Sequence, residues 1–181
     1  MKNLILFLSF FAFNHLHAQT TTYYLIRHAE KDTSAAGSTQ MQANPPLSSQ
    51  GKVRAEKLAA LMEKEGIDFL FSTDYLRTKS TLAPLATKIG KPIQIYSPNQ
   101  QAAWADTLRQ PPFRGKKLLI AGHSNTIPIL ANLLIGQKKY ENLADNEYGL
   151  IFQITIEGDQ FKDSIWRYWI LARMIFAQRD Y

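Results

Sequence analysis

Residues 22–30 have the sequence TYYLIRHAE, and residues 117–125 have the sequence KLLIAGHSN. Each segment begins with a short apolar run that is typical of a buried strand, and each ends in polar residues, as a strand that enters a loop does. A histidine lies at this point in both segments, His28 in the first and His123 in the second. In open α/β sheets, ligands bind beyond the carboxyl ends of the strands. We therefore expect the two histidines to meet at one edge of a sheet.

Four strand-and-helix units, followed by a hairpin, are expected along the chain. The expected strands are 22–26, 67–71, 93–96 and 117–121. The expected helices are 49–65 after a Ser48 or Ser49 cap, a helix that carries Arg77 and ends at Gly90 with a kink at Pro84, 101–109, and 127–135. Residues 150–156 and the run after Glu157-Gly158-Asp159 are expected to pair as a hairpin. This order predicts an α/β fold of three layers, α/β/α, with a mostly parallel central sheet closed by an antiparallel pair.

The amino-terminal 18 residues have the pattern of a signal peptide. Lys2 precedes an apolar run from Leu4 to Phe13, and the small residue Ala18 is a plausible cleavage position. The run is short for a membrane span, which needs about 20 residues. We therefore expect a signal peptide at 1–18 and one domain at 19–181. The product is expected to be exported, periplasmic or secreted, without a stable membrane anchor after cleavage.

The composition excludes several classes of protein. An apolar fraction of 45% excludes a disordered chain, and the absence of Cys excludes disulfides and thiolate nucleophiles. Lys and Arg number 21 against 15 Asp and Glu, but the basic residues are scattered rather than clustered, so we expect no nucleic-acid partner. Two histidines without an evident carboxylate partner fall short of the usual ligand count, so we expect no metal site and no cofactor.

Cationic groups are expected at the same edge as the histidines. Arg27 precedes His28, Arg77 lies just past the second strand, and Ser124 begins a helix next to His123. The guanidinium group matches the oxygens of phosphate, and unpaired N–H groups at a helix amino terminus favour an anion. This combination predicts a site for an anion with several oxygens, and phosphate fits it best.

Four motifs resemble the histidine phosphatase superfamily, which is also called phosphoglycerate mutase-like. They are Leu25-Ile26-Arg27-His28-Ala29-Glu30, then Pro46-Leu47-Ser48 with Gly51 and Ala55, then Ser72 with Arg77 and Thr81, and Gly122-His123-Ser124-Asn125-Thr126. The resemblance spans residues 24–156. It implies a phosphoglycerate mutase-like fold.

The resemblance also implies a mechanism. His28 would be the nucleophile that forms a phosphohistidine, while Arg27, Arg77 and His123 hold the phosphoryl oxygens. The expected activity is that of a metal-independent phosphomonoesterase, which hydrolyses a phosphorylated small molecule and releases inorganic phosphate. Covalent catalysis of this kind needs an unprotonated imidazole, and nearby arginines favour that form. The short chain favours hydrolysis over the mutase reaction.

The general acid is harder to assign from the sequence. Many members of the superfamily place a carboxylate after the third strand, and Asp106 is the only one between Tyr96 and Arg109. Glu30 is the second candidate. Two other functions stay open, a phosphohistidine protein phosphatase and a non-catalytic relative that binds a phosphorylated ligand.

Two further features have no assigned role. The loop from Lys31 to Pro46 is long enough to be functional. Aromatic residues near the tail are expected to pack in the core, and Trp104 to line either the core or a substrate cleft. The tail residues are Trp166, Tyr168 and Trp169.

Overall fold

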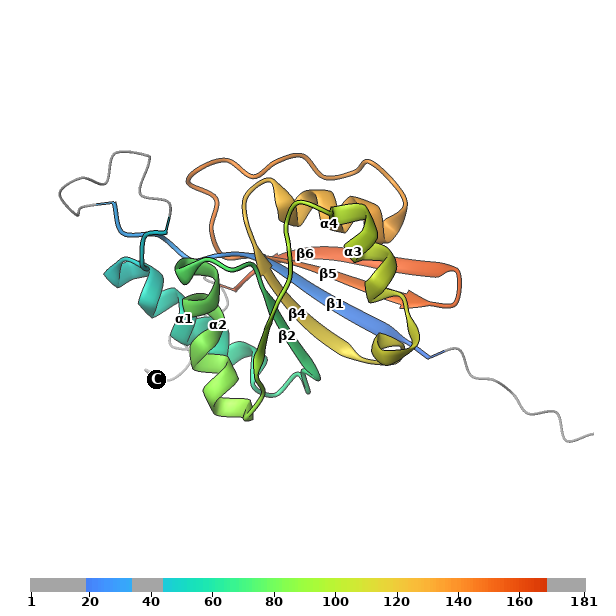
Figure 1. Cartoon of the computed structure of the whole chain (residues 1–181), viewed down its shortest axis with the longest axis horizontal. Helices are drawn as coiled ribbons and strands as arrows, with labels where there is room; N and C mark the ends of the chain where they lie inside the picture. Colours follow the sequence, from blue (N-terminus) through green and yellow to red (C-terminus); the bar gives the residue numbers. More distant parts are fainter. Residues whose placement is uncertain (1–18, 34–43, 169–181) are drawn as a thin grey trace, which may run out of the picture.

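The computed structural model describes residues 19–33 and 44–168 (Figure 1). In chain order the elements are β1 (Thr21–Arg27), α1 (Ser49–Met62), β2 (Phe69–Ser72), α2 (Leu76–Ile89), β3 (Ile93–Ile95), α3 (Gln101–Leu108), the 3₁₀ turn η1 (Pro111–Phe113), β4 (Lys117–Gly122), α4 (Thr126–Ile135), β5 (Leu150–Glu157) and β6 (Gln160–Arg167). The expected order of strands and helices is confirmed, and no boundary differs by more than three residues. The signal peptide at 1–18, most of the loop from Lys31 to Pro46, and Trp169 lie outside the described residues.

The described strands form one sheet in the order β3-β2-β4-β1-β5-β6. Strands β3, β2, β4 and β1 are parallel, whereas β5 and β6 are antiparallel. The expectation of a mostly parallel sheet closed by a hairpin is therefore confirmed. The register pairs Arg27 with Gly122 and Ser72 with Ala121. Because of this register, the residues that follow β1, β2 and β4 emerge together at one edge.

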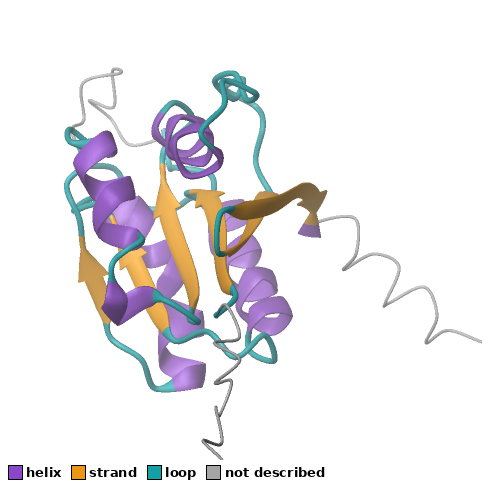
Figure 2. Cartoon of the chain, turned by 90° about the vertical axis from the view of Figure 1, so that its right-hand side faces the viewer, coloured by secondary structure: helices purple, strands orange, loops and turns teal. Residues whose placement is uncertain are grey.

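Helices cover both faces of the sheet, which gives the expected three layers (Figures 1 and 2). Helices α3 and α4 bury apolar side chains such as Leu108 and Leu130 on one face, and α1 and α2 bury Leu58 and Leu82 on the other. Fully burying a side chain of this size stabilises the fold by about 1.5–3 kcal/mol. The two apolar layers therefore fix the sheet edge on which the site is built.

Helix α1 begins where the sequence predicts, and it packs closely on the loop after β1. The side chain of Ser48 accepts a hydrogen bond from the N–H of Gly51 at 3.0 Å, so Ser48 is the amino-terminal cap. A Cβ atom at Gly51 would lie 2.2 Å from the carbonyl oxygen of Glu30. A glycine is therefore required here, because no side chain fits between the helix and the backbone that follows His28.

The aromatic residues singled out in the sequence pack mainly in the core. Tyr168 is 2% exposed, and Trp166 packs partly buried against the same apolar layer, as expected for the tail. Trp104 stacks on Tyr96 with ring centroids 5.3 Å apart and contacts Phe71 edge-on at 5.0 Å. Trp104 is thus a core residue on the α3 side of the sheet.

Candidate active site

The two histidines meet at the carboxyl edge of the sheet. Their ring centroids lie 5.5 Å apart in an edge-to-face arrangement. Strands β1 and β4 are neighbours, and the N–H of His28 donates to the carbonyl of Gly122 at 2.9 Å. The parallel pairing of two strands thus brings together residues that are distant in the sequence.

His28 is held as a neutral imidazole with a fixed tautomer. Its Nδ1 lies 2.7 Å from the carbonyl oxygen of Ala29, and a carbonyl only accepts, so Nδ1 carries the proton. The lone pair is therefore on Nε2. His28 is 5% exposed, and burial lowers its pKa to about 3, with contributions from the charges of Arg77 and Arg27. At neutral pH this side chain presents an unprotonated nitrogen, as a nucleophile requires.

A chain of buried hydroxyl groups fixes the tautomer of His123. Its Nδ1 faces Nη2 of Arg77 at 3.5 Å, and a guanidinium only donates, so the proton lies on Nε2. Nε2 then donates to Oγ1 of Thr73 at 3.0 Å, and Thr73 donates to Oγ1 of Thr78 at 3.0 Å. Thr78 donates onward to the carbonyl of Thr73 at 2.9 Å. Burial lowers the pKa of His123 to about 4, with contributions from Arg77 and Arg27.

Arg27 is oriented by the loop that precedes β5. Its Nη1 donates to the carbonyls of Ala144 at 2.7 Å and Glu147 at 3.0 Å. Its Nη2 donates to the hydroxyl of Tyr148 at 3.3 Å, and the guanidinium lies 4.1 Å from the centre of the Tyr148 ring. The Nε atom of Arg27 is buried and has no hydrogen-bond partner within the described chain.

Arg77 approaches the histidines from the start of α2. Its guanidinium lies 4.4 Å from the centre of the Tyr75 ring, and that ring contacts His123 edge-on at 4.9 Å. Burial and the charge of Arg27 lower the pKa of Arg77. Its Nε atom is also buried without a hydrogen-bond partner among the described residues. Arg27, Arg77, His28 and His123 together form a cradle for an anion, because the two buried Nε donors have no acceptor among the described residues and lie next to the two imidazoles.

The amino terminus of α4 lies beside this cradle. Thr126 begins the helix, and its Oγ1 accepts from the N–H of His123 at 2.9 Å. Asn125 makes no capping side-chain bond. Ser124 is half-buried next to His123, and its carbonyl accepts from the N–H of Leu143 at 2.9 Å. The predicted phosphate contact of Ser124 stays a prediction.

Glu30, one of the two acid candidates, is engaged in an ion pair. Nε of Arg54 lies 2.8 and 2.9 Å from its two carboxylate oxygens, and Arg54 also contacts it through Nη2. Burial acts to raise the pKa of Glu30, but the hydrogen bonds and charge of Arg54 outweigh it, and the pKa lies below its ordinary value. Glu30 is therefore ionised and structural in this arrangement.

Asp106, the other acid candidate, lies away from the cradle. Its side chain is exposed near the carboxyl end of α3, where it pairs with Arg109 at 3.4 Å. Arg109 in turn donates to the carbonyls of Leu133 and Leu134 in the last turn of α4, at the end of that helix opposite to His123. The prediction of Asp106 as a general acid near the phosphate therefore does not fit this geometry.

Three residues that surround the cradle were not singled out from the sequence. Thr73 carries a signal that could have identified it, because it follows β2 directly at the edge where the histidines lie. Tyr75 lies two positions further on. Tyr148 has no such signal, since it belongs to a loop without periodicity between α4 and β5.

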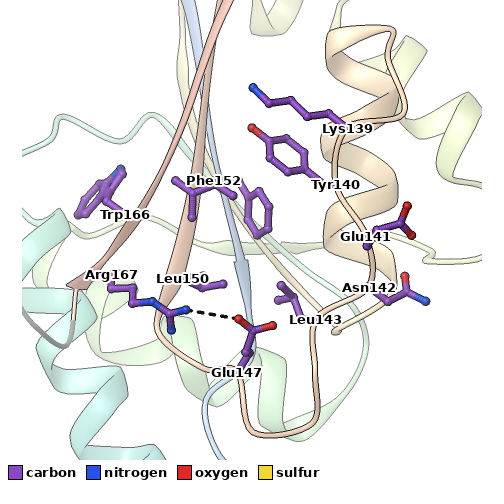
Figure 3. Close-up of a pocket in the computed structure, with 11 residues that line it drawn as sticks. Lys139, Tyr140, Glu141, Asn142, Leu143, Glu147, Leu150, Phe152, Trp166 and Arg167 are labelled. Carbon is purple, nitrogen blue, oxygen red and sulfur yellow. Dashed lines mark hydrogen bonds and ion pairs between the residues drawn. The ribbon is translucent and has the colours of Figure 1, made fainter.

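A cavity of about 650 Å³ lies between the loop that precedes β5 and the hairpin β5–β6 (Figure 3). The hairpin β5–β6 and the segment around Tyr140 line it, and it shares Glu147 with the loop that orients Arg27. In residues 19–33 and 44–168 there is no cluster of three or more His, Cys, Asp or Glu side chains that could hold a metal ion. No helix in the same part of the chain is long and apolar enough to cross a membrane.

The fold is similar to those of solved phosphatases. A mycobacterial glucosyl-3-phosphoglycerate phosphatase aligns with a TM-score of 0.65 and 13% identity, over 82% of this chain and 99% of that one. Another structure of that protein holds inorganic phosphate. The protein histidine phosphatase SixA, solved with tungstate, aligns with a TM-score of 0.65 and 15% identity, over 83% of this chain and 99% of its own.

Sequence comparison finds a match over part of the chain. A probable phosphoglycerate mutase, GpmB of Serratia proteamaculans (strain 568), is 34% identical over 67 residues. This segment covers 37% of the chain and spans only 31% of the length of that relative. Residues 23–98 match the model of the histidine phosphatase superfamily (branch 1). The resemblance seen in the motifs is thus confirmed over residues 23–98, where the chain matches the histidine phosphatase superfamily in sequence, and the fold is similar to those of the two solved phosphatases.

Proposed function

We propose that the protein is a metal-independent phosphomonoesterase that works through a phosphohistidine on His28. One observation carries this proposal: the neutral His28 ring, whose Nε2 is unprotonated, lies near two arginines whose buried Nε donors have no partner in the described part of the chain. A phosphate group satisfies all three at once, because it accepts from both arginines and offers its phosphorus to the nucleophile. The phosphate- and tungstate-bound relatives are consistent with an oxyanion in this fold.

The reaction has two steps. Nε2 of His28 attacks phosphorus, the bond from phosphorus to the ester oxygen breaks, and that oxygen takes a proton from a general acid as the alcohol leaves. Nδ1–H keeps its bond to the carbonyl of Ala29 and so stabilises the positive charge that forms on the ring. Water then attacks the phosphohistidine, and inorganic phosphate is released with the imidazole restored.

Arg27, Arg77 and His123 stabilise the transferring group. One guanidinium about 4 Å from a unit charge contributes about 4 kcal/mol at an effective dielectric constant of 20. A bound phosphate raises the pKa of His123, because an opposite charge nearby favours the protonated ring. Nδ1 then carries a proton and donates to a phosphoryl oxygen, while Nε2 stays bonded to Thr73.

The first experiment compares turnover of p-nitrophenyl phosphate by the wild type, by His28→Asn and by Arg77→Met. Asp106→Asn is the matched control, because it changes an exposed side chain away from the cradle. We expect His28→Asn to abolish turnover, Arg77→Met to lower it by on the order of 10²–10³-fold, and Asp106→Asn to leave it unchanged. A wild type that binds phosphate without turnover would instead support the non-catalytic relative.

The position of Asp106 favours a second candidate, a phosphohistidine protein phosphatase. With Asp106 distant and Glu30 paired to Arg54, neither predicted carboxylate is placed to protonate a leaving alcohol. A phosphorylated imidazole is a substrate whose P–N bond breaks without a strong acid. If this candidate is correct, a histidine-phosphorylated protein is cleaved far faster than any small ester.

A further inference from the structure

The proposed phosphomonoesterase needs a proton donor for its leaving oxygen, and the structure offers one that the sequence motifs do not contain. An alkoxide is a poor leaving group, so a positioned acid accelerates its departure by about 10²–10⁴-fold. Glu30 is held ionised by Arg54, and Asp106 is distant. The donor must therefore be another proton-bearing side chain that contacts the cradle.

Tyr148 has this position. Its hydroxyl oxygen accepts from Nη2 of Arg27 at 3.3 Å, and its ring lies over the guanidinium at 4.1 Å. Its ring centroid is 6.2 Å from that of His28. Because the oxygen accepts from Arg27, the phenolic proton is not used in that bond and is available to a third group, such as a substrate oxygen held between Arg27 and His28.

The loop that carries Tyr148 is fixed relative to Arg27. Nη1 of Arg27 binds the carbonyls of Ala144 and Glu147. The Glu147 carboxylate accepts from the N–H of Ala144 at 3.1 Å and from Nη2 of Arg167 on β6 at 3.4 Å (Figure 3). Tyr148 is thereby held against the guanidinium that we place on the phosphoryl oxygens, so it is preorganised rather than brought in from solvent.

We propose that Tyr148 is the general acid of the first step and the general base of the second, an inference that rests on the proposed phosphomonoesterase activity. As the bond from phosphorus to the ester oxygen breaks, the Tyr148 O–H proton moves to that oxygen and the alcohol leaves. The phenolate stays paired with the Arg27 guanidinium. It then takes a proton from the water that attacks the phosphohistidine, which restores the phenol and releases phosphate.

Tyr75 is the matched control. Its ring packs on Arg77 at 4.4 Å, much as Tyr148 packs on Arg27, and edge-on to His123. Within the described chain, however, its hydroxyl has no hydrogen bond to either arginine. Removing that hydroxyl therefore changes a tyrosine next to the cradle, but it removes no donor that is hydrogen-bonded to a guanidinium.

The experiment measures kcat/KM for Tyr148→Phe, Tyr75→Phe and the wild type with three substrates of decreasing leaving-group acidity: p-nitrophenyl, phenyl and glycerol phosphate. The parameter kcat/KM reports the step in which the leaving group departs. Loss of a general acid is expected to leave p-nitrophenyl phosphate almost unaffected and to lower kcat/KM for glycerol phosphate by on the order of 10²-fold or more. Tyr75→Phe is expected to keep the wild-type dependence on the leaving group.

Phenylalanine retains the ring that covers Arg27, and inorganic phosphate binding by calorimetry checks that the cradle of each variant is intact. An equal loss of kcat/KM on all three substrates would overturn the proposal, because it would show that Tyr148 only positions Arg27 and donates no proton to the leaving group. Asp145→Asn, on the loop that carries Tyr148, is a further variant in the same experiment. A leaving-group effect in Asp145→Asn but not in Tyr148→Phe would assign the acid to Asp145 instead. A wild type without turnover would refute the phosphomonoesterase itself, and the tyrosine role with it.

Discussion

Acidification from pH 7 to pH 5 is expected to destabilise the fold through its two active-site histidines. Both fold as neutral rings, with the pKa of His28 at about 3 and that of His123 at about 4, against an ordinary value of 6.5. At pH values between these lowered pKa values and 6.5, the unfolded chain binds more protons than the folded one. The free energy of unfolding therefore falls as the pH falls through 6.5.

The size of this loss depends on how far the pH lies below the pKa of histidine in the unfolded chain. At pH 5 a fully buried neutral histidine destabilises the fold by about 2 kcal/mol, since one pKa unit corresponds to about 1.4 kcal/mol. His28 is 5% exposed and should show this full effect, whereas the half-buried His123 should show less. Such a loss is a large part of an ordinary stability of about 5–15 kcal/mol.

Urea unfolding at pH 7 and pH 5, in buffer without phosphate, measures this effect. His28→Asn keeps a donor near the Ala29 carbonyl but removes the titrating ring. We expect the variant to lose about 2 kcal/mol less stability than the wild type between the two pH values. Other titrating groups act equally in both proteins and cancel in the comparison. An identical pH dependence of wild type and variant would refute the conclusion that His28 is buried and neutral.

Three substitutions test the packing and hydrogen bonding around the cradle. Gly51→Ala places a Cβ atom 2.2 Å from the Glu30 carbonyl oxygen, so thermal unfolding should show a loss of about 1–3 kcal/mol; an unchanged melting temperature would contradict the close approach. Thr73→Val removes the acceptor of the His123 Nε2–H and should lower the free energy of unfolding in urea by about 1–3 kcal/mol, whereas Thr73→Ser should keep the wild-type value. Equal unfolding free energies for the two variants would argue against the chain of hydroxyl groups. Arg54→Met leaves the Glu30 carboxylate without its partner and should cost up to about 3–5 kcal/mol at pH 7, with part regained at acidic pH as Glu30 protonates; a deficit that is the same at both pH values would contradict this ion-pair account.

The sheet and the meeting of the histidines could be predicted because both follow from local patterns. Apolar runs that end in Arg27-His28 and in Gly122-His123 mark the carboxyl ends of strands, and parallel strands present these ends at one edge. Arg77 is placed correctly for the same reason. As the second residue of α2, it stays near the edge from which that helix starts.

The role expected for Asp106 shows where such reasoning stops. Position after a strand does not suffice, because a helix in this fold runs away from the carboxyl edge. Asp106 lies near the end of α3 and so at the far side of the molecule from His123. Tyr148 could not be predicted at all, since it reaches Arg27 through a tertiary contact made by an irregular loop 121 residues away in the chain.

Direct detection of the phosphoenzyme tests the central claim. The wild type is mixed with p-nitrophenyl phosphate and quenched in alkaline denaturant, which preserves the acid-labile P–N bond, and the tryptic peptide that begins at His28 is analysed by mass spectrometry. A phosphoryl group on Nε2 of His28, absent from His28→Asn, is the expected result, because Nδ1 is engaged with the Ala29 carbonyl. Steady release of p-nitrophenol with no phosphate on His28 at any time, or with phosphate on Nδ1, would contradict it.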